Sequence, residues 1–141
     1  MVTRHFMAAV VGGVAALGLA GCSTPEPALG GTTATVMIDG NDTGGALDVR
    51  CSQTGWSWYI ETPGKGNGFT AVLSMDGPVT AESVDFRDLG GFTGSFWGGN
   101  LGEAEVSGDN GRYTITGKAD GSFGEKPGDA VTADFRIQTN C

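Results

Sequence analysis

Apolar and polar residues alternate along most of the chain from residue 35 onward, in short runs separated by Gly, Asp, Asn and Pro. Apolar side chains at every second position are typical of β-strands with one buried face. The residues that share a parity within a run are Val36 and Ile38; Leu47, Val49 and Cys51; Trp56, Trp58 and Ile60; Phe69, Ala71, Leu73 and Met75; Val84 and Phe86; Phe92 and Phe96; Ala104 and Val106; Tyr113 and Ile115; and Val131, Ala133, Phe135, Ile137 and Cys141. No window of eleven or more residues has a helical apolar period. The pattern predicts an all-β domain over residues 35–141, a small antiparallel β-sandwich or partly closed barrel.

Turn residues divide these runs. Gly108-Asp109-Asn110-Gly111 separates two alternating runs and is the strongest hairpin signal of the chain, because Asn-Gly favours a two-residue turn. Asp39-Gly40-Asn41-Asp42 resembles the opening of a calcium loop, but the twelfth position, where a bidentate Glu is expected, holds Arg50. We therefore interpret residues 39–42 as a turn.

The N-terminal segment has a different pattern. Residues 6–19 form an uncharged apolar run of about fourteen residues, shorter than the roughly 20 that span a bilayer and typical of a secretory signal. It ends in Leu19-Ala20-Gly21-Cys22, and small residues before a cysteine are typical of a lipoprotein signal peptide. We expect residues 1–21 to be removed. The alternative is an ordinary cleaved signal, or a short anchor, with Cys22 nearby by chance.

Cys22 then becomes the first residue of the mature chain and carries the acyl chains, palmitate among them. Two or more chains give stable membrane anchoring, whereas one gives marginal binding. Residues 22–34 are expected to form a linker, which reaches at most about 40 Å when extended. The protein should lie on the extracytoplasmic face of the cell membrane. Thr24, Thr32, Thr33 and Thr35 are glycan acceptors in one interpretation of this segment and part of a plain tether in the other.

Two cysteines remain after Cys22 is lipidated. Cys51 and Cys141 both fall on the apolar parity of their runs, and two cysteines in an exported domain predict one disulfide. It would join the first hairpin to the last strand from the inside. Two free thiols are the alternative.

The net charge and the histidine content argue against several classes of function. Residues 22–141 contain 7 Lys and Arg against 16 Asp and Glu, a net charge of −9, which argues against binding to nucleic acid or to anionic lipid. The only histidine is His5, inside the expected signal, so the commonest general base and metal ligand is absent from the mature chain. We predict no catalytic residue, no metal site and no cofactor.

Three tryptophans are candidate sugar-contact residues. Trp56 and Trp58 share the parity of Ile60, which predicts core packing. Trp97 has the parity opposite to Phe96 and precedes two glycines, so it is expected to be exposed and is the best candidate for a contact residue.

Glu103 and Glu105 lie two positions apart on one face of a predicted strand. Paired carboxylates serve as acid and base in glycosidases. Here they alternate with Ala104 and Val106, which is typical of a solvent face, and we favour that interpretation.

The chain resembles the mycobacterial lipoprotein antigen family, the LpqH-like lipoproteins. The resemblance rests on the cysteine after the signal, the Thr-bearing linker, the two further cysteines and the order of segments 36–40, 48–51, 70–73, 111–119 and 135–141. It implies an acylated surface antigen that engages host innate immune receptors through lipidated Cys22, with no enzymatic residues. The chain departs from the family in its shorter linker and in Trp56, Trp58 and Trp97.

These observations predict a non-enzymatic, lipid-anchored envelope lipoprotein that is displayed as a surface antigen. The alternatives are an envelope binding module for a lipid, a glycan or a small apolar ligand, and an inhibitor of a lytic enzyme.

Overall fold

The computed structural model describes residues 32–141, which form an antiparallel all-β domain with no helix among them. The strands follow the runs of alternating apolar residues, as the sequence predicts. Their bounds are β1 (Thr32–Ile38), β2 (Asn41–Asp42), β3 (Leu47–Thr54), β4 (Ser57–Glu61), β5 (Gly68–Ser74), β6 (Thr80–Leu89), β7 (Phe92–Trp97), β8 (Glu103–Asp109), β9 (Arg112–Phe123) and β10 (Val131–Asn140).

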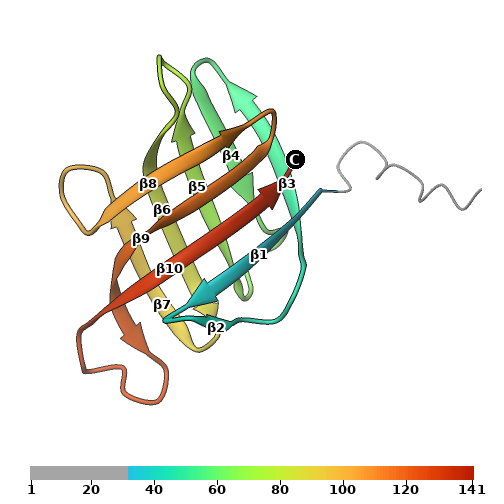
Figure 1. The fold of residues 1–141 in the computed structure, drawn as a ribbon. Coiled ribbons are helices and arrows are strands. Elements are labelled where there is room, and N and C mark those ends of the chain that lie inside the picture. The colour runs from blue at the N-terminus through green and yellow to red at the C-terminus, as the bar shows by residue number, and fades with distance from the viewer. Residues whose placement is uncertain (1–31) are drawn as a thin grey trace, which may run out of the picture.

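The strands close into a ring. Neighbours pair in the order β1, β3, β4, β5, β6, β7, β9 and β10, and β10 returns to β1, while β8 extends the free edge of β9. Figure 1 shows two layers, with β1, β8, β9 and β10 in front and β3 to β7 behind, their strands crossing. The layers join through short pairings, β1 with β3 and β7 with β9. The fold is therefore a partly closed barrel, one of the two forms expected from the pattern.

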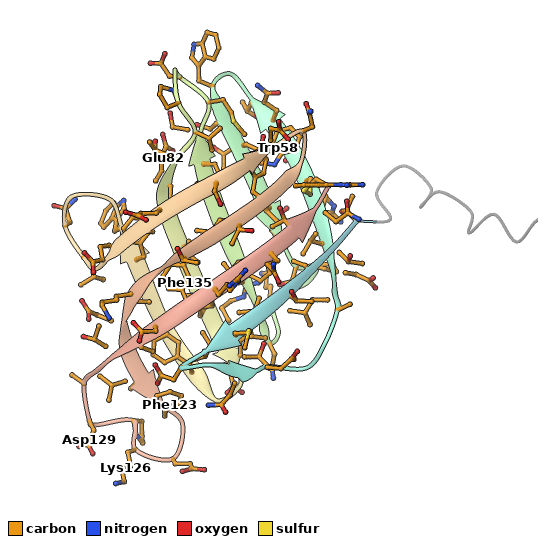
Figure 2. All side chains as sticks on the ribbon, viewed as in Figure 1. Trp58, Glu82, Phe123, Lys126, Asp129 and Phe135 are labelled. Atoms are coloured by element: carbon orange, nitrogen blue, oxygen red, sulfur yellow. A yellow bond between two sulfur atoms is a disulfide. The ribbon has the colours of Figure 1, made fainter. Side chains whose placement is uncertain are left out.

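Large apolar side chains fill the space between the two layers. Phe86 of β6 in the back layer meets Phe135 of β10 in the front layer edge to face, with ring centroids 5.2 Å apart. The side chains, with Phe135 and Trp58 labelled, are drawn in Figure 2. The inward residues of β10 (Ala133, Phe135 and Ile137) are all buried, as their parity predicts. Burial of one face of the strands that form the ring is the main stabilisation of the domain.

The disulfide between Cys51 and Cys141 confirms the predicted pairing. The two Cα atoms lie 6.0 Å apart, and the bond joins β3 to the residue that follows β10. Both cysteines pack against the core. The predicted hairpin also forms: Asp109 pairs with Arg112, and Asn110 and Gly111 make the turn between β8 and β9.

The prediction for Trp56 is wrong. Trp58 packs against the core as expected, but Trp56 is 67% exposed. The reason is local: Gly55, with φ of 59°, and Trp56 form the turn between β3 and β4, and β4 begins only at Ser57. A residue in a turn does not keep the parity of the strand that follows it.

The N-terminal predictions lie outside the described residues. These are the signal peptide over residues 1–21, the lipidated Cys22 and the linker up to residue 31. β1 already begins at Thr32, within the segment expected to be linker, and the Thr32 hydroxyl donates a hydrogen bond to the Val49 carbonyl. Among residues 32–141 there is no helix long and apolar enough to cross a membrane.

Candidate functional site

The two ends of the domain have different surroundings. Thr33 at the start of β1 pairs with Asn140 at the end of β10, so the chain enters the domain beside its C-terminus and the disulfide. Figure 1 shows the connection between β7 and β8 at the opposite side of the molecule from the start of β1. Whatever precedes Thr32 in the chain is therefore attached at the side remote from the β7–β8 turn.

Trp97 is the last residue of β7 and is 63% exposed, as its parity predicts. The turn after it is held by backbone hydrogen bonds. The Trp97 amide donates to the Leu101 carbonyl at 2.7 Å, and the Leu101 amide donates back to the Trp97 carbonyl at 2.9 Å. The Gly98 amide donates to the Glu82 carbonyl of β6 at 2.8 Å. The backbone that carries this exposed indole is thus fixed on both sides.

A surface depression of about 430 Å³ lies beside Trp97. Ser83 and Asp85 of β6 line it, together with Ser95 and Trp97 of β7 and with Leu101. Ser83 pairs with Trp97, and Asp85 pairs with Ser95. The Ser95 hydroxyl donates a hydrogen bond to Asp85 Oδ1 at 2.5 Å, so hydroxyl and carboxylate groups border one side of an exposed aromatic ring.

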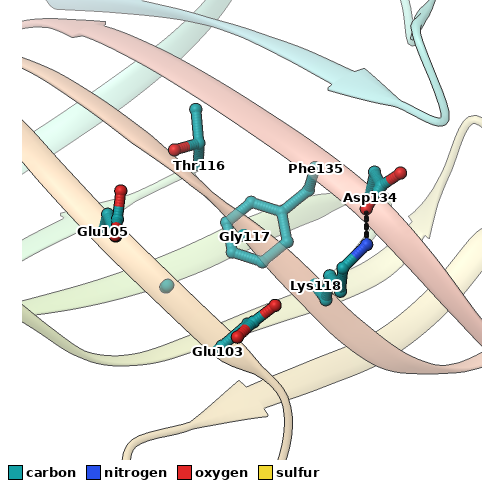
Figure 3. A pocket seen from close by; sticks show the side chains of 8 residues that line it. Glu103, Glu105, Thr116, Gly117, Lys118, Asp134 and Phe135 are labelled. Atoms are coloured by element: carbon teal, nitrogen blue, oxygen red, sulfur yellow. Dashed lines mark hydrogen bonds and ion pairs between the residues drawn. The ribbon is translucent and has the colours of Figure 1, made fainter.

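A second depression, of about 560 Å³, lies on the front layer over β8, β9 and β10 (Figure 3). Glu103 and Glu105 of β8 border it, with Thr116 and Lys118 of β9 and Asp134 of β10. Gly117 of β9 also lines it, and a Cβ at Gly117 would clash with the backbone of β8 and with the ring of Phe135.

One ion pair dominates the electrostatics of this second depression. Lys118 Nζ donates to Asp134 Oδ1 at 2.5 Å. This hydrogen bond, with the charges of Asp134 and Glu103, holds the pKa of Lys118 above its ordinary value of 10.5. The carboxylates of Asp134, Glu103 and Asp39 thus act on one ammonium group on an exposed sheet face. Among the described residues, no cluster of His, Cys, Asp and Glu could hold a metal ion.

The surface residues singled out from the sequence lie on β7 and β8. Glu103 and Glu105 are exposed on one face of β8, as a solvent face predicts. Trp97 is exposed, and its role as a contact residue remains a prediction. The polar residues Ser83, Asp85 and Ser95 are not predicted from the sequence as part of a site. Alternation puts all three on outward faces, but only the register between β6 and β7 brings them to Trp97.

Comparisons with known proteins agree with the resemblance seen in the sequence. The family model described as Mycobacterium 19 kDa lipoprotein antigen matches residues 27–141. A putative lipoprotein of Mycobacterium avium subsp. hominissuis is 39% identical over 129 residues, which cover 91% of this chain and 89% of the relative. The probable lipoprotein LppE of Mycobacterium tuberculosis is 32% identical over 129 residues, covering 91% of each chain.

Lipoprotein LpqH of Mycobacterium tuberculosis is 31% identical over 107 residues, which cover 75% of this chain and 67% of the relative. All three relatives carry the description of a lipoprotein, which implies a membrane-anchored protein of the cell envelope. The matched residues include the whole described β domain with both half-cystines. The chain belongs to the Mycobacterium 19 kDa lipoprotein antigen family.

Proposed function

We propose that the chain is anchored by acyl chains on Cys22 to the extracytoplasmic face of the cell membrane. Its β domain is displayed there as a surface antigen with no enzymatic role, and the lipidated Cys22 engages host innate immune receptors. The observation that carries the proposal is the position of Cys22. It directly follows the apolar segment and two small residues, and the family match begins five residues later, at residue 27.

The charge of the chain supports anchoring by lipid alone. A net charge of −9 over residues 22–141 repels an anionic membrane surface, so electrostatic attraction contributes nothing to membrane attachment. Two or more acyl chains supply enough buried hydrocarbon to hold a soluble domain stably. β1 begins at Thr32, ten residues after Cys22, so the domain would lie within about 35 Å of the lipid surface.

The chemistry of the surface supports a role without catalysis. Residues 22–141 contain no histidine, so acid–base chemistry would fall on carboxylates, Lys and Tyr. The carboxylates that come closest to a constellation are Glu103, Glu105 and Asp134, and they lie on an open sheet face where water screens them. An enclosed, water-excluding site is what makes such groups effective catalysts.

The filled interior argues against the alternative of a ligand held inside the barrel. Phe69, Phe92 and Leu73 are fully buried between the layers, and Phe86 contacts both Phe92 and Phe135. Ligand cavities have volumes of roughly 300–1,000 Å³, and these side chains occupy the space between the layers.

The anchoring proposal is tested by Cys22→Ala in the full chain, expressed in a mycobacterial host. We expect the wild-type protein to enter the detergent phase on Triton X-114 separation and the variant to enter the aqueous phase or the medium. Ser23→Ala is the matched control and should partition like the wild type. A Cys22→Ala protein that still enters the detergent phase would contradict the anchor.

The host interaction has a separate test. Purified wild-type protein and the Cys22→Ala variant are applied to reporter cells that express innate lipopeptide receptors. We expect activation by the wild type and none by the variant at equal concentration. Equal activation by both would show that the lipid on Cys22 is not the recognised group.

A further inference from the structure

The outer face of the back layer carries two parallel rows of side chains that neither the family nor the anchor explains. The first row runs across four paired strands, from Tyr59 of β4 through Val72 and Ser83 to Trp97 of β7. Each residue is the direct cross-strand partner of the next. At about 4.8 Å between strands, Tyr59 and Trp97 lie roughly 14 Å apart along the row. The row begins and ends on an aromatic side chain.

The second row runs beside the first and is polar. Glu61 of β4 pairs with Thr70, Thr70 pairs with Asp85, and Asp85 pairs with Ser95 of β7. Arginines balance its acidic groups. Arg50 Nη1 lies 3.8 Å from Glu61 Oε1. Arg87, the next outward residue of β6 after Asp85, donates a hydrogen bond to the Thr70 hydroxyl at 3.0 Å. This part of the surface therefore offers hydrogen-bond donors and acceptors without a strong net charge.

Trp97 combines an exposed side chain with a backbone that is fixed by hydrogen bonds. Its indole is 63% exposed, and exposed aromatic groups beside a depression mark binding surfaces. The hydrogen bonds of the turn to Leu101 and Glu82 fix the backbone below it. A ligand that stacks on the indole therefore meets a prepositioned contact, which lowers the entropic cost of binding.

A neutral pyranose fits this combination of groups. One face of a pyranose ring presents C–H groups that stack on an indole, and its rim carries hydroxyls that donate to a carboxylate such as Asp85 and accept from hydroxyls such as Ser83. Acidic glycans are disfavoured by the net charge of −9. A bilayer is disfavoured because the β7–β8 turn lies on the side of the molecule opposite to the start of β1 (Figure 1).

We propose that the outer face of β4 to β7 binds a neutral oligosaccharide, with Trp97 stacked on one pyranose ring, Asp85 accepting hydrogen bonds from the hydroxyls of that ring, and Tyr59 contacting the far end of the sugar chain. The ligand is a chain of neutral pyranose sugars, from the cell's own envelope or from a host glycoprotein. This proposal is independent of the anchor on Cys22, and its failure leaves the anchoring function untouched.

The test follows the indole N–H signals of the full chain by ¹H–¹⁵N NMR, in a detergent that carries no sugar head group. Trp56, Trp58 and Trp97 are assigned by single Trp→Phe changes. Two probe sets separate the sources: neutral oligosaccharides released from the envelope of the producing cells, and neutral N-glycan oligosaccharides from host glycoproteins. We expect one set to shift the Trp97 signal in a saturable way and to leave the Trp56 signal unchanged.

Variants then locate the contact. Trp97→Ala should weaken binding at least about tenfold, and Asp85→Asn and Tyr59→Ala several-fold. Trp56→Ala is the matched control, because Trp56 is exposed to a similar degree and lies in the β3–β4 turn, outside both rows, and it should bind like the wild type. Circular dichroism spectra that match the wild type would show that the variants are folded.

Three results would overturn the proposal. In the first, no oligosaccharide of either set shifts the Trp97 signal at millimolar concentration. In the second, Trp56→Ala and Trp97→Ala lose equal affinity. In the third, brominated lipid in vesicles quenches Trp97 fluorescence, or Trp97→Ala converts a sedimenting dimer to a monomer, which would assign the surface to a bilayer or to a second copy.

Discussion

At the scale of single residues, the core depends on two buried polar side chains as well as on apolar ones. Thr139 of β10 accepts a hydrogen bond from the Tyr113 amide at 3.1 Å and donates to the Gly111 carbonyl at 3.2 Å. Thr62 accepts from the Phe69 amide at 3.0 Å. Each hydroxyl thus gives a buried strand amide, of Tyr113 or of Phe69, a hydrogen-bond acceptor. Sequence alternation puts Thr139 on the inward face but says nothing of its partners, which lie 26 and 28 residues away.

Replacing Thr139 by Val keeps the shape of the side chain and removes its hydroxyl. The Tyr113 amide then stays buried without an acceptor, so we expect the free energy of unfolding to fall by about 1–3 kcal/mol. Urea unfolding measures the change. Thr116→Val, at an exposed position of β9, is the control and should change stability by less than about 0.5 kcal/mol. Equal effects of the two changes would contradict this role of Thr139.

The pKa of Asp42 predicts how the stability of the native state changes at low pH. Asp42 Oδ1 accepts hydrogen bonds from the amides of Gly45 at 2.6 Å and Gly44 at 2.8 Å, and these bonds hold the pKa of Asp42 below its ordinary value of 3.8. A pKa lowered by folding stabilises the native state above the unfolded value, and this contribution is lost as the pH falls through the folded value. We expect a ¹³C carboxyl titration to give a midpoint below 3.8. A midpoint at or above that value would show that the loop bonds are not formed.

At the scale of elements, tight turns set the register of the hairpins. Asn110 and Gly111 between β8 and β9 have φ of 49° and 81°, the left-handed conformation that an Asn-Gly turn needs. Gly40, between β1 and β2, has a similar φ of 79°. The two glycines differ in their surroundings. A Cβ on Gly111 would meet Cys141 at 3.0 Å, whereas a Cβ on Gly40 would meet open space.

Comparing Gly111→Ala with Gly40→Ala therefore separates backbone strain from crowding against the disulfide. Left-handed strain alone costs about 1–2 kcal/mol for an alanine. We expect Gly40→Ala to lose about that much and Gly111→Ala to lose measurably more, because Cys141 must move as well. Thermal unfolding under oxidising conditions measures both. A smaller loss for Gly111→Ala than for Gly40→Ala would contradict the close approach of the turn to Cys141.

Most of the strands could be predicted from the sequence, because one buried face imposes a period of two. In β7, Phe92 and Phe96 are both buried, as their shared parity predicts, and the outward position of Trp97 is correct. Trp56 was mispredicted because the Gly55 turn breaks the parity. Ser83, Asp85 and Ser95 could not be placed beside Trp97, because cross-strand register depends on the irregularity between Phe86 and Leu89.

At the scale of the whole molecule, the ring is closed by pairings between strands distant in sequence. β1 pairs with β10, and the disulfide joins Cys51 to Cys141 across a sequence separation of 90. Alternation predicts strands but not their order, since every inward face looks alike in sequence. The disulfide was the one long-range contact that could be predicted, because only two cysteines were left to pair.

Removing the disulfide should show how much it contributes to the free energy of unfolding. We expect Cys51→Ser with Cys141→Ser to lower the free energy of unfolding by about 4–5 kcal/mol, because the unfolded chain gains the entropy of an open loop. Urea unfolding of the double variant measures the loss. The wild type in reductant should unfold at the same urea concentration as the variant. A double variant as stable as the oxidised wild type would contradict this contribution.

The central claim is that a disulfide-bonded β domain is displayed on a lipid anchor at Cys22. Mass spectrometry of the N-terminal peptide of the mature protein, purified from producing cells, tests it most directly. The account predicts a chain that begins at Cys22 and carries the mass of a diacylglyceryl group, with or without a further acyl chain on its amino group. A mature chain that begins at another residue, or an unmodified Cys22, would contradict it.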